Sequence, residues 1–137
     1  MVNPELAKSY MLRARIRLRV LEDFLKSKDY PDVVRESQEI VELIEKALLL
    51  YVGIEPPKWH DVSDIILDNQ TKFPSEFLSP FKKILRDIKW LRSQRELSFY
   101  GDMDFIPENS YTLQDALRAM DTANKFFKIA TEFIPKD

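Results

Sequence analysis

Two arginines in the amphipathic segment after Ser79 are the first candidates for chemistry in this sequence. Counted at about 100° per residue, Arg92 and Arg95 fall within roughly 40° of the apolar stripe that runs through Phe81 to Ile88. A guanidinium suits phosphate, because its planar donors match the oxygens of the anion. A charge on the inner face of a bundle is costly unless it is paired or faces a wet cleft. Two interpretations stay open: a phosphate site, or arginines that reach past the bundle end or pair with glutamates of segment 31–53.

Further polar residues interrupt the apolar stripes of other segments: Arg13, Arg17, Ser37 and Asn124. The first two lie within roughly 40° of Leu6 and Phe24 by the same count. Charge adds to this pattern, because residues 1–28 and 82–98 each carry a net charge of +4, whereas residues 29–53 carry −4. The two basic segments either form one positive surface for nucleotide phosphate or RNA, or are neutralised by the acidic segment. Arg92, Arg95, Arg13, Arg17 and Asn124 are therefore the candidate ligand-binding residues.

The composition excludes several other kinds of site. The 137 residues include no cysteine, one histidine (His60) and two glycines (Gly53 and Gly101). Without cysteine there are no disulfides, iron–sulfur clusters or thiol nucleophiles, and one histidine cannot form a two-histidine metal site. Two isolated glycines cannot build a glycine-rich phosphate loop, so we expect them at helix ends. We expect no metal and no cofactor.

The periodicity of apolar residues predicts an all-α protein, a single domain over residues 1–137. Helix starts are indicated at Asn3-Pro4-Glu5, for a helix to about residue 27, and at Tyr30-Pro31-Asp32, for a helix that Gly53 ends. A short helix is expected over 60–69, begun by Asp61 or Ser63, and a longer one from Ser79-Pro80 to about residue 99. Thr112 caps the last helix, whose stripe is Leu113, Leu117, Met120, Phe127 and Ile134, with Ala116, Ala123 and Ala130 beside it. Short connections imply an antiparallel four-helix bundle with one additional short helix.

Some apolar side chains do not belong to the predicted core stripes of their helices. Leu12, Ile16 and Val20 lie opposite the stripe of the first helix, and Trp90 lies away from the stripe of its own helix. Helices that are apolar on two sides pack centrally or against another molecule, so we expect a homodimer. The first residues contain no basic segment followed by an apolar run, and no stretch approaches the roughly 20 apolar residues of a membrane span. We expect a cytoplasmic protein without membrane contact.

Two stretches of the sequence resemble the HEPN family of small helical domains. One runs from Ser37 to Gly53 and continues through Pro56-Pro57-Lys58-Trp59-His60-Asp61-Val62. The other is Arg95-Glu96-Leu97-Ser98-Phe99-Tyr100-Gly101-Asp102, followed by Pro107, Tyr111 and Asp115-Ala116, and is similar to an archaeal and bacterial subgroup. The resemblance implies a bundle that dimerises about a two-fold axis, with a positive cleft at the interface. It also implies either a metal-independent ribonuclease, often a toxin paired with a minimal nucleotidyltransferase, or a non-catalytic nucleotide-binding domain.

The ribonuclease motif that the resemblance implies is an arginine followed, after four to six residues, by a histidine. Arg95 fits the arginine, but the partner positions hold Tyr100, Gly101 and Asp102. Histidine titrates near neutrality and transfers protons readily, whereas a tyrosine of pKa about 10 is a poor base. His60 comes too early in the chain for the motif, and we expect it to serve as a cap or a loop donor. Arg95, Tyr100 and Asp102 are the candidate catalytic residues, with structural roles open for the last two.

Three functions compete on this basis. The preferred one is a dimeric domain that binds nucleotides or RNA through its arginines and lacks the usual ribonuclease pair. The second is a ribonuclease toxin that uses Arg95 with Tyr100 or Asp102 in place of histidine. The third is a module that binds only protein, with a minimal nucleotidyltransferase as the expected partner.

Overall fold

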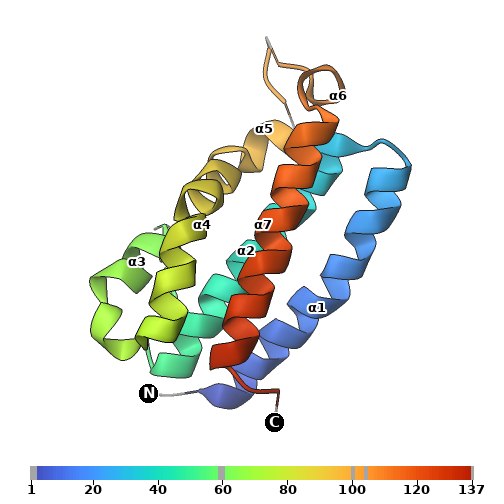
Figure 1. Ribbon diagram of the computed structural model, residues 1–137. Coiled ribbons are helices and arrows are strands. Elements are labelled where there is room, and N and C mark those ends of the chain that lie inside the picture. The colour runs from blue at the N-terminus through green and yellow to red at the C-terminus, as the bar shows by residue number, and fades with distance from the viewer. Residues whose placement is uncertain (1–2, 59–60, 100, 104, 137) are drawn as a thin grey trace.

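Four long helices form the body of the protein, as the apolar periodicity predicts. The computed structural model describes residues 3–58, 61–99, 101–103 and 105–136. The long helices are α1 (Pro4–Lys26), α2 (Tyr30–Val52), α4 (Ser75–Ser93) and α7 (Leu113–Phe133). Successive long helices run in opposite directions, and α1 and α4 lie on opposite sides of the bundle (Figure 1). The predicted antiparallel all-α bundle is confirmed, and within the described ranges there is no helix long and apolar enough to cross a membrane.

Side chains at the helix starts explain why three of the long helices begin where the sequence predicts. The Asn3 side chain accepts a hydrogen bond from the Leu6 N–H at 3.2 Å, and the Asp29 side chain accepts one from the Asp32 N–H at 3.3 Å. Thr112 caps α7 in a capping box. Each oxygen satisfies a backbone donor that has no partner inside its helix. Gly53 ends α2 with a left-handed φ of 87°, as expected.

The prediction for the start of α4 is wrong by one turn. The helix begins at Ser75, so Pro80 lies inside it rather than at its entrance. The additional turn is held by Phe77, whose ring stacks on that of Phe73 at 5.1 Å and on that of Phe81 at 5.4 Å between centroids. Burial of these rings offsets the hydrogen bond that a proline inside a helix removes.

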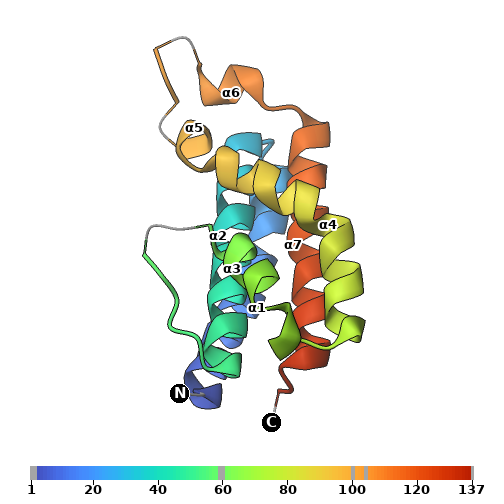
Figure 2. The ribbon, with the colours of Figure 1, turned by 90° about the vertical axis from the view of Figure 1, so that its left-hand side faces the viewer.

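The remaining elements are short. The helix expected over 60–69 is α3 (Val62–Asp68), whose N-cap is Asp61, and a 3₁₀ turn, η1 (Gln70–Lys72), follows it. His60 lies outside the described residues. The helix expected to run on to residue 99 breaks at Gln94, after which α5 (Arg95–Phe99) begins. A further short helix, α6 (Pro107–Ser110), lies in the segment expected to be a loop. Figure 2 shows α3 on the α2 and α4 side of the bundle and α5 and α6 at one end.

The buried face of α7 differs from the predicted leucine stripe. Leu113 and Leu117 are exposed, whereas five residues have no exposed area: Ala116, Ala119, Ala123, Phe126 and Ala130. Small side chains let neighbouring helices approach closely, so the alanines belong to the buried face of α7, and Leu113 and Leu117 lie outside it. Asn124, expected to interrupt the inner stripe, is consequently exposed, and its Nδ2 donates to the Met120 carbonyl at 2.9 Å.

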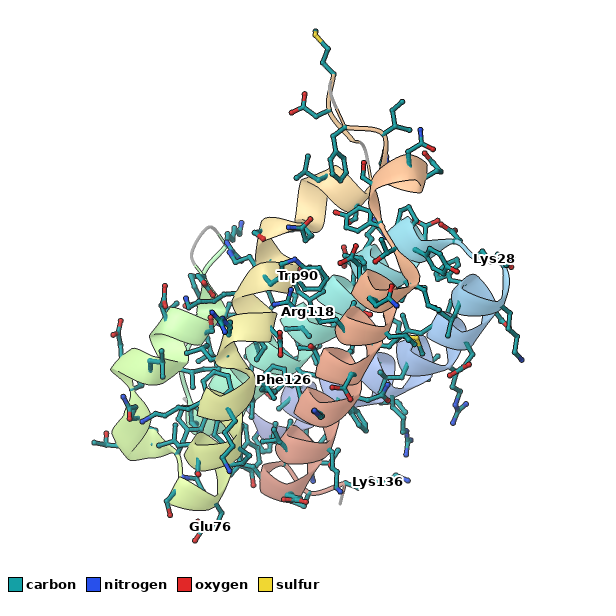
Figure 3. The ribbon with its side chains drawn as sticks, turned by 45° about the horizontal axis from the view of Figure 1, so that its top comes forward. Lys28, Glu76, Trp90, Arg118, Phe126 and Lys136 are labelled. Atoms are coloured by element: carbon teal, nitrogen blue, oxygen red, sulfur yellow. The ribbon has the colours of Figure 1, made fainter. Side chains whose placement is uncertain are left out.

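Trp90, a candidate dimer contact in the sequence, packs within the chain between α4 and α7. The Arg118 guanidinium lies 4.1 Å from the centroid of the indole ring, and its Nε donates to Asp87 at 2.7 Å (Figure 3). The Arg118 guanidinium therefore contacts both an aromatic ring and a carboxylate of α4, and both contacts connect α7 to α4. The ring of Phe126 lies deeper, 5.7 Å from that of Phe81.

Candidate anion-binding site

A pocket of about 410 Å³ lies where α4 passes into α5. Its walls come from one short stretch of sequence, and the lining residues are Arg92, Ser93, Arg95, Leu97, Gly101 and Asp102. Both arginines that the helical phase singles out therefore line one pocket, together with two of the three residues at the position of the motif histidine. The third, Tyr100, lies outside the described residues.

The break at Gln94 shapes this pocket. The Gln94 N–H donates to the Leu91 carbonyl at 3.0 Å and closes α4, and the Gln94 carbonyl accepts from the Ser98 N–H at 2.9 Å and starts α5. The Gln94 side chain is fixed as well, because the Tyr111 hydroxyl donates to its Oε1 at 2.7 Å. Burial raises the pKa of Tyr111 to about 12, so this hydroxyl keeps its proton and remains a donor. The relative positions of Arg92 and Arg95 thus depend on a hydrogen bond from the segment before α7.

Gly101 closes the far side of the pocket in a conformation that favours glycine. Its φ is 76°, and its N–H donates to the Leu97 carbonyl at 3.1 Å. A Cβ at this position would lie 2.6 Å from the Phe105 carbonyl oxygen and 2.8 Å from Pro107 Cδ. Asp102 and Phe105 then exchange two backbone hydrogen bonds of 2.9 and 3.1 Å. This tight turn places Asp102 at the rim.

The two arginines differ in their partners. Arg95 Nη1 lies 3.2 Å from Glu42 Oε1 on α2, and the Arg95 side chain is 52% exposed. No carboxylate in the described part of the chain lies within ion-pair distance of Arg92. The Arg95 end of this ion pair is exposed, whereas Glu42 is only 15% exposed. Arg95 therefore forms the ion pair with a glutamate of α2 that one interpretation of the sequence expects, and both arginines line the pocket.

Asp102 does not pair with Arg95. Its Oδ1 accepts a hydrogen bond from the Met103 N–H and so caps the turn that follows. The described lining residues thus offer two guanidinium groups that can hold a phosphate, one hydroxyl from Ser93 and one carboxylate. The described residues also contain no group of three acids or histidines arranged to hold a metal ion.

A buried acid lies behind the arginines. Glu45 on α2 is 4% exposed, and its Oε2 has no hydrogen-bond partner among the residues that the structure describes. Burial raises the pKa of Glu45 well above its usual value, and Asp61 and Glu42 raise it further, while the charges of Arg92 and Lys89 act in the opposite direction. Folding therefore favours the protonated form of this carboxyl group. Sequence reasoning missed Glu45 because it placed the glutamates of this helix outside the buried face.

Lys89 forms two ion pairs beside the arginines. Its Nζ lies 3.0 Å from Asp61 and 2.7 Å from Asp64, and so connects α4 to α3. Burial disfavours the charge of Asp61, but the hydrogen bonds from Ser63 and Lys89 outweigh this and lower the pKa of the carboxyl group. The ion pairs hold α3 beside the turn of α4 that precedes Arg92.

The remaining candidate residues lie elsewhere. Arg17 on α1 pairs with Glu36 and Glu39 of α2 at 3.5 and 3.7 Å, and the Arg13 guanidinium lies 5.5 Å from the centroid of the Tyr10 ring. Because α1 packs on α2 and α7, on the other side from α4, the basic segments 1–28 and 82–98 do not form one positive surface. Of the two alternatives for these segments, the ion pairs of Arg17 agree with neutralisation by the acidic segment 29–53. Ser37 is buried on α2, with a hydroxyl oxygen that has no partner.

Comparison with known proteins assigns the chain to a family. The model of the HEPN domain matches residues 7–133, and the chain therefore belongs to the HEPN family. It is also similar to a protein of Methanocaldococcus jannaschii named "Putative toxin MJ1304". The two are 26% identical over 139 residues, which cover 96% of this chain and 90% of the relative. No solved structure matches the chain at a significant level.

Proposed function

We propose that the protein binds the phosphate groups of nucleotides or RNA in the pocket lined by Arg92 and Arg95. The observation that carries the proposal is the convergence of two guanidinium groups on one open pocket, in which Arg92 has no ion-pair partner among the described residues. Two arginines that share an anion form charge-assisted hydrogen bonds, which are stronger than those between neutral groups. A pocket of about 410 Å³ also falls within the range of small-molecule sites.

The site supports binding better than cleavage. Metal-independent cleavage of RNA needs one group that takes the proton of the 2′-hydroxyl and another that gives a proton to the leaving oxygen. At the positions that follow Arg95, Gly101 is a structural residue, and the Asp102 carboxylate already caps a turn. The guanidinium groups supply charge but no proton at neutral pH.

Binding experiments with single variants test the proposal. We expect Arg92→Ala to weaken binding of ATP or of a short RNA about tenfold in calorimetry at low salt. For RNA, the slope of the logarithm of the binding constant against the logarithm of the salt concentration should also decrease by about 1, the contribution of one phosphate contact. Arg86→Ala is the control, because Arg86 is an exposed arginine of α4 that does not line the pocket. Equal affinities of the wild type and of Arg92→Ala, or no binding at low salt, would contradict the proposal.

A ribonuclease toxin is the second candidate, favoured by the name of the relative from Methanocaldococcus jannaschii. In that case Arg95 stabilises the phosphorane, and Tyr100 or Asp102 takes the place of the missing histidine. Cleavage of RNA that Arg95→Ala abolishes, and that Asp102→Asn or Tyr100→Phe reduces, would support this candidate. RNA that stays intact in the presence of the purified wild type would exclude it.

The proposed function includes a homodimer and a minimal nucleotidyltransferase as protein partner. The exposed apolar residues of α1 support the dimer, and membership of the HEPN family supports both. Light scattering at micromolar concentration measures the first, with twice the mass of one chain as the expected result. Co-purification with a nucleotidyltransferase encoded beside this protein measures the second, and separate elution of the two would contradict the pairing.

A further inference from the structure

A groove of about 730 Å³ lies between the first half of α1 and the end of α7, at the end of the bundle opposite to α5 and α6 (Figure 1). It shares no residue with the arginine pocket, which lies at that other end. The lining residues of α1 run from Glu5 to Arg15, which spans about 15 Å along the helix axis. The groove is therefore elongated, and its volume falls within the range of small-molecule sites.

The floor of this groove is apolar. Met11 and Ile134 are 7% and 2% exposed and belong to the core, whereas Leu12 is 47% exposed and Phe127 is half-buried. The hydroxyl of Thr131, which also lines the groove, donates its proton to the Lys128 carbonyl at 2.8 Å. A ligand in the groove therefore meets mainly apolar side chains, and an apolar body gains from its removal from water.

Positive side chains line both ends of the groove. Lys8 and Arg15 are half-buried and Lys136 is exposed, and no carboxylate in the described part of the chain lies within ion-pair distance of any of them. The one acid among the described lining residues is Glu5, so three cations and one carboxylate give the lining a net charge of +2. An anion complements this charge.

The charges around the groove favour Arg15 as the residue that holds the anion. Glu5 and Lys136 lie at the other end, where the negative charge of Glu5 offsets part of the positive charge, and Asp137, the next residue in sequence, lies outside the described residues. Exposed residues that flank the groove without lining it carry charges that cancel: Arg19 and Glu22 on α1, and Lys128 and Glu132 on α7. Arg15 thus retains an uncompensated charge beside the apolar floor.

We infer that this groove binds an aliphatic carboxylate of medium chain length, with its carboxylate on the Arg15 guanidinium and its chain along Leu12 and Phe127. A guanidinium offers two parallel N–H donors to a carboxylate, and such charge-assisted hydrogen bonds are stronger than neutral ones. The length of the groove favours an extended chain over a compact ring. The site is separate from the arginine pocket, so the inference does not rest on the proposed phosphate binding.

Octanoate is the probe for this site, with titrations of the wild type followed by protein NMR. We expect saturable binding with a dissociation constant of about a millimolar or lower, and shorter carboxylates should bind roughly two- to fourfold more weakly for each methylene removed. Octanol and octylamine carry the same chain without the negative charge and should bind at least about tenfold more weakly. No saturable binding of octanoate, or an equal affinity for octanol, would overturn the inference.

A pair of arginine variants tests the position of the carboxylate. Arg15→Gln should weaken octanoate binding about tenfold, because glutamine keeps the helix but supplies no charge. Arg19→Gln is the matched control, since Arg19 lies one turn further along the same helix, is exposed and does not line the groove. Its affinity should stay within about twofold of the wild type. Equal affinities of the wild type and of Arg15→Gln would overturn the assignment.

A second pair tests the apolar floor. Leu12→Gln should weaken octanoate binding and reduce its dependence on chain length, whereas Ile16→Gln should change neither, because Ile16 is equally exposed, at 49%, and does not line the groove. Both side chains are exposed, so circular dichroism should show unchanged helix content. Arg92→Ala should bind octanoate as the wild type does. Loss of octanoate binding in Arg92→Ala, or equal effects of Leu12→Gln and Ile16→Gln, would overturn the site.

Discussion

Glu45 is the residue whose environment departs furthest from the usual one for its type. The charges of Glu42, Asp61, Lys89 and Arg92 act on it, and yet its Oε2 has no hydrogen-bond partner in the described part of the chain. Burial of an ionised carboxylate without a full set of hydrogen bonds is costly, and this raises the pKa of the group. Because Arg92 acts on Glu45 in the opposite direction to this burial, the charges of the two residues are linked.

Stability should depend on pH through this residue. Its pKa is raised by folding, so the folded state holds a proton that the unfolded state releases, and stability falls as the pH rises from the unfolded value towards the folded one. In that window the wild type should lose up to about 1.4 kcal/mol per pH unit relative to Glu45→Gln, which cannot ionise. Urea unfolding of both proteins between pH 5 and pH 8 measures the difference. Parallel pH profiles would show that Glu45 is ionised in the folded protein.

At the scale of elements, the junction between α4 and α5 determines the site. The apolar pattern continues through Leu91 towards Phe99, so the sequence predicts one helix, and the structure breaks it at Gln94. A residue far along the chain, Tyr111, holds the Gln94 side chain at this break through a hydrogen bond. A pattern based on neighbouring residues contains no information on such a partner. The sequence could predict that Arg92 and Arg95 lie together, but not the bend that opens a pocket between them.

The glycine after α5 should be required for this geometry. We expect Gly101→Ala to destabilise the protein by about 1–3 kcal/mol, because alanine disfavours a φ of 76° and its Cβ would overlap Phe105 and Pro107. The turn would have to shift, so anion binding should weaken as well. Gly53→Ala is the matched control: its φ is also left-handed, at 87°, but it lies at the end of α2 and lines no part of the pocket. Thermal unfolding and calorimetry should show both losses for Gly101→Ala and only the loss of stability for Gly53→Ala.

At the scale of the whole molecule, α2 and α7 form the centre of the bundle. Residues with strong local signals were predicted correctly: the caps Asn3 and Thr112, the glycine stop at Gly53 and the periodicity of α2. The buried face of α7 was not predicted correctly. Alanine is only weakly apolar, so a stripe of leucines has a higher summed hydrophobicity than the alanine stripe beside it. Which of two adjacent stripes becomes buried depends on how closely the neighbouring helices approach, and this is settled only when all helices pack together.

The packing at the centre should dominate stability. Phe126 is fully buried on α7 and its ring contacts that of Phe81. We expect Phe126→Ala to cost about 3–5 kcal/mol, through lost burial and the cavity that remains. Phe127 is the matched control, because it lies next in sequence on the half-buried side of the same helix and its truncation leaves a smaller cavity. Urea unfolding should show a clearly smaller loss for Phe127→Ala, and equal losses would show that the two rings contribute alike.

The pocket also has an evolutionary consequence. All of its lining residues lie between Arg92 and Asp102, whereas the long helices are held together by residues spread over the whole chain. Substitutions in one short stretch can therefore alter or abolish the chemistry of the site and leave most of the core unchanged. In such a protein, selection acts on the scaffold and on the site largely independently. At position 102 a histidine requires one substitution within this stretch, whereas at position 101 the left-handed φ and the contacts with Phe105 and Pro107 oppose it.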